Sequence, residues 1–183
     1  MTDRTWTLTA ADGEVLIRTG VTGRAARLGH RLHIAVNSWW ATVSWAGERP
    51  TVVEFSVDVD SLEVRGGEGG LKSLSGPEKF VARSNALKSL DAAKSPRILF
   101  HGTDIRAAEG GYRISGTLEI KARELPYALD LRVDDLGASW RMSSSAVIRQ
   151  TEFGIKPYSL ALGSIRVADD VTVSFTAERA KAS

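Results

Sequence analysis

A chain of 183 residues with 43% hydrophobic and 25% charged side chains has the size and composition of one soluble globular domain, not of a disordered protein. Its 24 Lys and Arg residues exceed its 22 Asp and Glu residues by only two, so no broad cationic surface for nucleic acid is expected. Because the chain has no cysteine, disulfides, thiolate metal ligands and cysteine nucleophiles are excluded.

The first segment, MTDRTWTLTAADGE, contains no basic start followed by an apolar run. We therefore expect no secretion signal. No later stretch approaches the roughly 18 uncharged apolar residues of a membrane-spanning helix, so no transmembrane segment is expected and a cytoplasmic location is predicted. Short strands are predicted at residues 5–9 and 14–18, separated by an Asp-Gly turn.

Residues 26–46, ARLGHRLHIAVNSWWATVSWA, are rich in histidine and tryptophan. If residues 37–38 form a two-residue turn, the flanking strands pair as a hairpin. Strand alternation then places His30 on the inner face, and His33 and Trp40 on the outer face. This segment is therefore predicted to be a wall of the fold and not a reactive cluster.

Apolar and polar residues alternate in several later segments, which is typical of strands with one buried face. The second and third of the regular strands are predicted to form a hairpin around residues 123–126, and a polar tail follows at 179–183. The regular strands are predicted at 51–59, 112–121, 127–134 and 171–178, and less regular ones at 97–105 and 139–149.

One segment has a helical pattern. Ser75 followed by Glu78 forms a capping-box sequence, and apolar residues then recur at helical spacing. These features predict a single long helix over about 76–92, which ends before Pro96 because the residue preceding proline avoids the helical region. The glycine-rich residues 65–76 lack the Gly-Lys pair of a phosphate-binding loop, so a flexible connection is predicted there.

About ten short antiparallel strands and one helix predict an all-β fold. The apolar faces could be hidden in a sandwich or in a barrel, and periodicity alone does not distinguish the two. The distinction matters because the interior of an eight-stranded barrel is either filled by its own side chains or holds one small ligand.

No motif for metal or nucleophilic chemistry is convincing. His30 and His33 are three residues apart on a strand and face opposite sides, so they do not form a zinc site with His101. Residues 143–145, three serines, lack the sequence of a nucleophile elbow. We expect no catalytic residue, no metal and no cofactor.

A run of arginines is the remaining candidate for polar recognition. Arg18, Arg24, Arg27 and Arg31 lie around one predicted turn and could hold a phosphate through bidentate hydrogen bonds. A solvated rim of the fold explains the same run.

Four segments in the same order resemble the YceI-like family across nearly all of residues 1–183, as a single domain. IRQTEFGI at 148–155 resembles the family's C-terminal signature, and SPRILF at 95–100 resembles the strand that follows its helix. Residues 116–120 and 163–171 match two further segments. The resemblance implies a lipocalin-like antiparallel β-barrel of about eight to ten strands that binds a long polyisoprenoid, such as a prenyl quinone or prenyl phosphate, with no established catalysis.

Under this interpretation the ligand lies inside the barrel and needs no sequence-specific contact, because each buried methylene contributes about 0.8 kcal/mol. The helix, through Phe80 and Leu87, is expected to cover one mouth of the barrel. Arg27, His30 and Arg31 are expected to contact the polar end of the ligand at the mouth where it enters. The predicted ligand-binding residues are Ile34, Phe55, Val57, Phe80, Leu87, Phe100, Ile114, Leu118, Leu129, Met142, Phe153, His30, Arg27 and Arg31.

The leading hypothesis is therefore a non-enzymatic protein that binds, sequesters or transports an isoprenoid or another long apolar molecule. One alternative is an enzyme that uses the barrel pocket with His30 as general base. Another is a filled barrel that binds a protein partner through exposed Trp40. A homodimer is compatible with each of these hypotheses.

Overall fold

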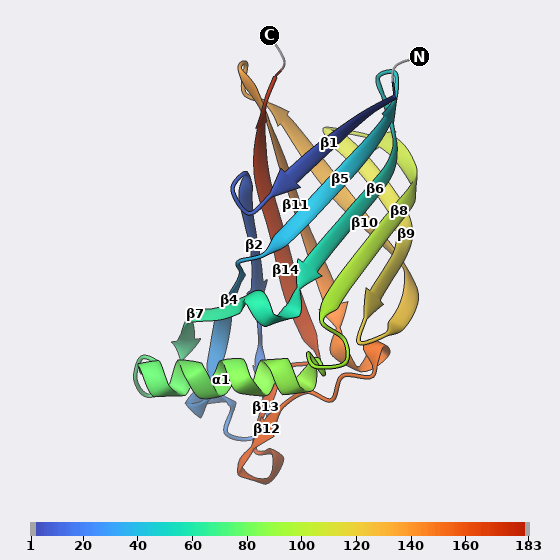
Figure 1. Ribbon diagram of the computed structural model, residues 1–183. Helices are drawn as coiled ribbons and strands as arrows, with labels where there is room; N and C mark the ends of the chain where they lie inside the picture. Colours follow the sequence, from blue (N-terminus) through green and yellow to red (C-terminus); the bar gives the residue numbers. More distant parts are fainter. Residues whose placement is uncertain (1–2, 182–183) are drawn as a thin grey trace.

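The computed structural model describes residues 3–181, which form a large antiparallel sheet, a small second sheet and one α-helix (Figure 1). The predicted all-β fold with a single helix is confirmed for these residues. The strands of the large sheet are β1 (Asp3–Thr9), β2 (Gly13–Arg18), β4 (His30–Val36), β5 (Trp39–Ala46), β6 (Arg49–Asp58), β7 (Leu62–Gly69), β8 (Arg97–Ala108), β9 (Gly111–Ile120), β10 (Arg123–Asp135), β11 (Ser139–Arg149) and β14 (Asp170–Ala180). The small sheet contains β3 (Val21–Thr22), β12 (Ser159–Leu160) and β13 (Ile165–Val167), and the helices are α1 (Gly76–Ser89) and the short 3-10 turns η1 (Ala26–Leu28), η2 (Val59–Ser61), η3 (Gln150–Phe153) and η4 (Ala161–Gly163).

The large sheet curls into a barrel because the chain bends at three places and then continues as a further strand. The first bend joins β1 to β2, the second joins β4 to β5, and the third joins β6 to β7. The strand order of the sheet is β1-β5-β6-β8-β9-β10-β11-β14-β2-β4-β7, so β1 and β2, β4 and β5, and β6 and β7 lie in different parts of one sheet. At the second and third bends, Asn37 N donates to Ser61 O at 3.2 Å and Asp58 N donates to Ser38 O at 3.0 Å, which continues the pairing across the bends. The three bent pairs and the five single strands together give a barrel of eight strands.

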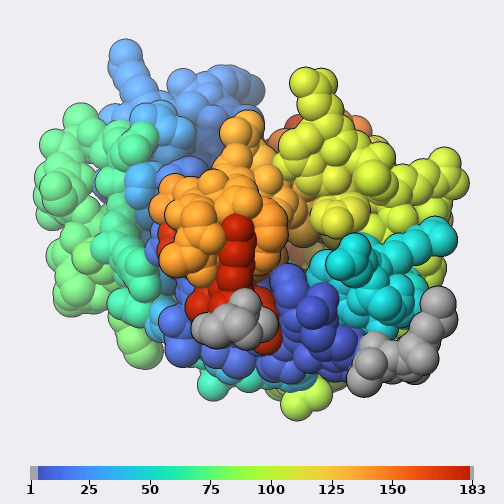
Figure 2. All heavy atoms as spheres, turned by 90° about the horizontal axis from the view of Figure 1, so that it is seen from above, coloured from blue at the N-terminus to red at the C-terminus, as the bar shows by residue number. Residues whose placement is uncertain are grey.

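The curled sheet closes through the pairing of β14 with β2, and a side chain at the end of β14 also reaches β1. Ala177 pairs with Gly13 in β2, and Glu178 N donates to Asp12 O at 2.9 Å in the bend. The Arg179 guanidinium then reaches Thr7 O of β1 at 3.1 Å. Seen from the end of the barrel opposite α1, the last residues of β14 lie beside β1 and β11 (Figure 2).

The predicted hairpin at residues 37–38 is wrong. β4 pairs with β2 and β7, whereas β5 pairs with β1 and β6. Residues 37–38 bend the chain without reversing it, because their polar side chains bind the neighbouring bent strand: Asn37 Nδ2 donates to Glu63 Oε2 and Ser38 Oγ donates to Asp58 Oδ2. Side-chain alternation defines the faces of a strand but not its partners, so the predicted inner and outer faces still agree with the structure.

Two further predictions need correction. The β9–β10 hairpin forms, but its turn is at Lys121 and Ala122, which have positive φ angles of 54° and 56°, and residues 123–126 already belong to the ladder. Residues 65–69 form the end of β7 and pair with β4, so they are not a flexible connection. A β-carbon on Gly67 would lie 3.0 Å from Arg31 O, which indicates that Gly67 permits close approach of β7 and β4 and does not mark a loop.

The helix begins where its capping box predicts. Glu78 N donates to Ser75 Oγ at 3.3 Å, and Ser75 N donates to Glu78 Oε2 at 2.7 Å. Arg83 fixes α1 to the barrel, because its Nε donates to the carbonyl oxygen of Leu62 at 2.7 Å. As Figure 1 shows, α1 lies across one end of the barrel. Neither it nor any other helix within residues 3–181 has the length and apolar character needed to cross a bilayer.

Candidate functional site

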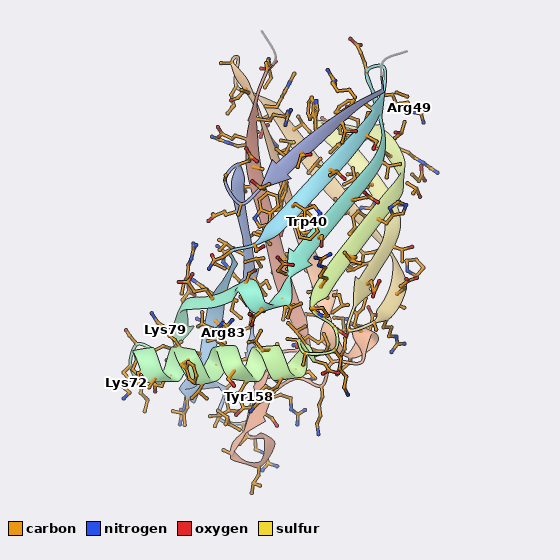
Figure 3. All side chains as sticks on the ribbon, in the orientation of Figure 1. Trp40, Arg49, Lys72, Lys79, Arg83 and Tyr158 are labelled. Atoms are coloured by element: carbon orange, nitrogen blue, oxygen red, sulfur yellow. The ribbon has the colours of Figure 1, made fainter. Side chains whose placement is uncertain are left out.

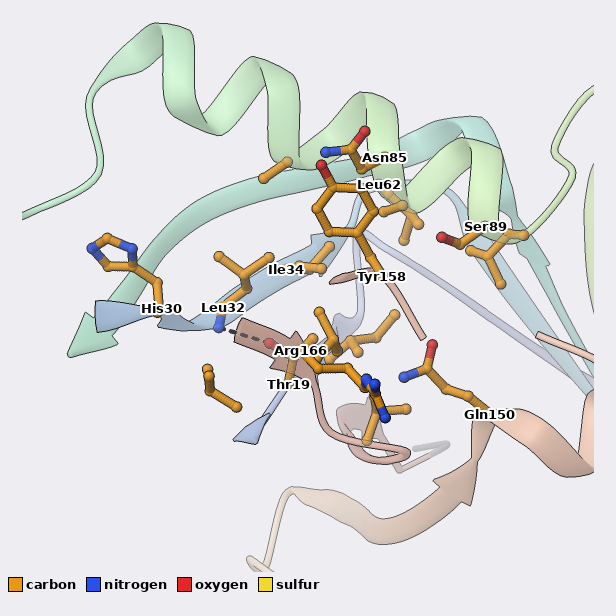
Figure 4. A pocket seen from close by; sticks show the side chains of 18 of the residues that line it. Thr19, His30, Leu32, Ile34, Leu62, Asn85, Ser89, Gln150, Tyr158 and Arg166 are labelled. Atoms are coloured by element: carbon orange, nitrogen blue, oxygen red, sulfur yellow. Dashed lines mark hydrogen bonds between the residues drawn. The ribbon is translucent and has the colours of Figure 1, made fainter. Parts of the chain in front are cut away.

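A cavity of about 610 Å³ lies between α1, the small sheet and the inner face of the barrel (Figure 4). Its volume is within the range of small-molecule sites, roughly 300–1,000 Å³. Most of the lining is aliphatic and comes from both sheets and the helix: Ile17, Val21, Leu28, Leu32, Ile34, Leu62, Leu74, Pro77, Val81, Ala82, Ala86, Leu90, Ile98, Ile120, Ile148, Ile155, Leu160, Ile165, Val167, Val171 and Val173.

The helix leaves this space open because its inner face carries small side chains. Ala82, Asn85, Ala86 and Ser89 recur at the spacing of one helical face and line the cavity. Asn85 and Ser89 face the interior in Figure 4. A face of leucine or phenylalanine at these positions would occupy the same space.

The sheet supplies the opposite wall through residues two apart on a strand. Leu32 and Ile34 of β4 share one face, as do Val171 and Val173 of β14. These branched side chains give a smooth aliphatic surface with no buried charge, so the wall favours an apolar ligand and does not fix its chemical identity.

Polar groups are few, and several of them already have hydrogen-bond partners within the fold. His30 Nε2 lies 2.7 Å from the carbonyl oxygen of Lys72, and Thr19 Oγ1 accepts a hydrogen bond from Leu32 N at 2.9 Å (dashed in Figure 4). Gln150 Nε2 donates to Ala168 O at 2.8 Å.

Arg166 is different, because none of the ion pairs found within residues 3–181 includes it. Together with Tyr158 it lines the side of the cavity formed by the small sheet (Figure 4). The lining therefore contains one guanidinium that could bind an anionic or carbonyl group of a ligand.

Comparison with known proteins is consistent with this architecture. The family model of the YceI-like domain matches residues 6–179. The chain belongs to the YceI-like family. BcnA of Burkholderia cenocepacia has a similar crystal structure, with a TM-score of 0.70 and 17% sequence identity over 93% of this chain and 98% of that chain. A YceI protein of Campylobacter jejuni gives a TM-score of 0.61 at 12% identity, covering 82% of this chain and 85% of that one.

At these identities the structural likeness shows the fold alone. A search of curated proteins found no match. The candidate site of this YceI-like protein is therefore argued from its own residues.

The predicted ligand-binding residues fall into four groups in the structure: residues that line the cavity, residues of the helix, residues of the packed core, and two arginines. Ile34 and His30 line the cavity. Leu87 packs from α1 against the barrel core, whereas Phe80 is 73% exposed and the helix covers the cavity with other residues. The inward-facing residues that pack in the two core clusters without lining the cavity are Phe55, Val57, Phe100, Ile114, Leu118, Leu129, Met142 and Phe153.

The two predicted arginine contacts lie outside the cavity lining. Arg27 is exposed on η1. Arg31 points to the outer face of β4, where its Nη2 lies 3.7 Å from Glu68 Oε2. The arginine that lines the cavity is instead Arg166, an exposed residue of β13.

Sequence reasoning missed most of the real lining. The small residues along α1 carry a usable signal, because Ala82, Asn85, Ala86 and Ser89 repeat at helical spacing on a helix expected to cover an apolar interior. Tyr158 and Arg166 carry no such signal, since the small sheet that positions them is built from strands of two and three residues.

The three histidines lie in separate environments. His33 Nε2 lies 3.4 Å from Glu68 Oε1 on the outer face, and His101 Nδ1 lies 3.5 Å from Glu54 Oε1 on another strand. His30 contacts the backbone at the cavity mouth. Of the three serines at 143–145, Ser144 donates to the carbonyl oxygen of Asp130 in the neighbouring strand.

Proposed function

We propose that this protein binds an elongated apolar ligand in the cavity beneath α1, in order to sequester or transport it. The observation that carries the proposal is the preformed cavity of about 610 Å³ with a mainly aliphatic lining. Ten buried ligand carbons would contribute about 8 kcal/mol, which corresponds to a dissociation constant near 1 μM before the cost of ordering the ligand. Membership of the YceI-like family supports a polyisoprenoid, such as a prenyl quinone or prenyl phosphate, as this ligand.

We further propose that the polar end of the ligand lies at the mouth. His30 and Arg166 line the cavity, and in this proposal Arg27 and Arg31, which lie outside the lining, form the outer rim of its opening. Arg166 is the strongest candidate for a phosphate or quinone oxygen, because no carboxylate of the described chain is paired with it.

The geometry favours binding over the two other functions considered. The Nε2–H of His30 donates to the carbonyl oxygen of Lys72, and none of the hydrogen bonds found within residues 3–181 joins the ring to a serine hydroxyl or a carboxylate, so the histidine has no catalytic partner there. Trp40 lies under the guanidinium of Arg97, 5.0 Å from the ring centroid, so its face is less accessible to a protein partner.

The test combines identification of a ligand with a variant that fills the cavity. Denaturing mass spectrometry of an organic extract should reveal a retained lipid, and titration with a prenyl alcohol, a prenyl phosphate and a prenyl quinone should give a ranked set of affinities. Asn85→Trp places a large ring in the cavity and should weaken binding by at least about tenfold.

Lys88→Trp is the matched control, because Lys88 is exposed on the same helix. It should bind as the wild type does. Equal affinity of the folded Asn85→Trp variant for every probe, or the failure of all three probes to bind the wild type, would contradict the proposal.

A further inference from the structure

The mouth of the cavity has an apolar rim. Leu28 of η1, Val81 of α1 and Leu160 of β12 line the cavity and are also 43%, 54% and 51% exposed, so they mark its opening to solvent. Two more leucines extend from adjacent loops without lining the cavity: Leu71 is 87% exposed and Leu162 is fully exposed. We call these five residues the apolar rim.

The backbone that holds Leu162 outward is strained. Ala161, Leu162 and Gly163 are consecutive residues with positive φ angles of 48°, 55° and 86°. Residues with a β-carbon adopt this conformation at a cost, and burial of an apolar side chain does not compensate for it here. Ser164 stabilises the turn, because its Oγ donates to Ala161 O at 2.7 Å. A fully exposed leucine on a strained turn indicates a role other than folding.

The apolar rim lies in the cationic part of the molecule. The segments around the mouth, residues 19–34, 66–94 and 150–168, contain ten Lys and Arg residues and four Asp and Glu residues. The remainder of the chain contains fourteen Lys and Arg residues and eighteen Asp and Glu residues. The small net charge of the whole chain therefore conceals a marked asymmetry.

The acidic residues near the mouth are also partly neutralised. Glu68 lies within 3.7 Å of Arg31 and 3.4 Å of His33, and Glu78 is part of the helix cap. Lys72 and Lys79 lie around α1 in Figure 3. Lys72 directly follows the exposed Leu71, and Arg166 lies on the short strand that follows Leu162, so each of the two most exposed leucines has a basic residue close to it in the chain.

We propose that the apolar rim docks on an anionic lipid bilayer, with Leu71 and Leu162 inserted among the headgroups and the basic side chains bound to the phosphates. Shallow insertion of apolar side chains alone, or electrostatic attraction alone, does not attach a protein stably to a bilayer. The two effects reinforce each other when they act together. The five side chains come from separate elements, and a fluid bilayer can accommodate such separated apolar side chains individually, whereas a protein partner would need a surface shaped to all of them. The mouth would then open toward the acyl chains, so a ligand of the proposed kind would enter without crossing water.

The test measures co-sedimentation with ligand-free vesicles, one set of phosphatidylcholine alone and one containing phosphatidylglycerol. The wild type should bind the anionic vesicles only, and added salt should release it. The double variant Leu71→Asn, Leu162→Asn should bind about tenfold less well. Asparagine tolerates positive φ, so this variant should keep the turn at η4.

Leu136→Asn is the matched control, since Leu136 is 44% exposed in the β10–β11 turn at the opposite end of the barrel, and it should bind as the wild type does. Docking would be overturned if the wild type failed to bind anionic vesicles, bound both vesicle types equally, or bound unchanged in the double variant. Leu71 and Leu162 do not line the cavity, so the double variant should keep the solution affinity for prenyl probes. Failure of docking is thereby separated from failure of the proposed ligand binding.

Discussion

The barrel interior consists of a packed part with an aromatic centre and a hollow part with a mainly aliphatic lining. In the packed part, Trp39, Phe55 and Phe175 meet with ring centroids 5.4 to 6.0 Å apart and fill the space between opposite strands. In the hollow part the barrel is covered by α1, whose inward side chains are small. Both parts are apolar, and the volume of the side chains that face inward decides which part can hold a ligand.

The largest effect should come from removing the centre of the packed part. Trp39 is 2% exposed, and Trp39→Ala should lower the free energy of unfolding by about 3–5 kcal/mol because the barrel cannot collapse around the space left. Urea unfolding measures this loss. Trp40→Ala, on the outer face of the same strand, should cost about 1 kcal/mol or less. Equal losses for the two variants would mean that the packed part is not the source of stability.

A matched pair of isoleucines tests the difference between the two parts directly. Ile114 is 2% exposed in the packed part, whereas Ile165 is half-buried at the edge of the cavity. Ile114→Ala should cost about 2–5 kcal/mol, but Ile165→Ala should cost about 1 kcal/mol or less, because its side chain already borders open space. Denaturant midpoints with unchanged slopes provide the comparison. A larger loss of stability for Ile165→Ala than for Ile114→Ala would show that side chains of the protein fill the cavity in solution.

Much of the packed part could be predicted from the sequence. Strict alternation in residues 51–59 and 171–178 identified Phe55 and Phe175 as belonging to strands with one buried face, and Ser75 with Glu78 identified the start of the helix. These signals are local, since each depends only on residues that are close together in the sequence.

The hollow part could not be predicted in the same way. Whether Ile34 borders a cavity or a neighbouring side chain depends on the volumes of residues on β14 and α1, which lie far away in sequence. The bend at residues 37–38 shows the same limit, because alternation gave the correct faces and the wrong partners. Arg166 reaches the cavity only through the pairing of β13 with β3 and β12.

The smallest expected effect concerns the helix that covers the hollow part. Hydrogen bonds from the backbone N–H and the hydroxyl of Ser75 hold the pKa of Glu78 below its ordinary value. A carboxyl group with a lowered pKa stabilises the folded state fully above its unfolded pKa, and this contribution is lost as the pH falls through the folded value. Acidification should therefore loosen the start of α1 while the packed part stays intact.

Hydrogen exchange of the α1 amides measures this loosening. At neutral pH, Glu78→Gln should exchange faster than the wild type in the first turn, because a neutral amide accepts the capping hydrogen bond more weakly than a carboxylate and loses the favourable charge at the helix N-terminus. Below the pKa of Glu78 the two proteins should exchange alike, since both then carry a neutral side chain. Glu48→Gln, in the β5–β6 turn away from α1, should change neither profile. If the exchange rates of Glu78→Gln and the wild type still differed at acidic pH, the charge of Glu78 would not be what stabilises the start of α1.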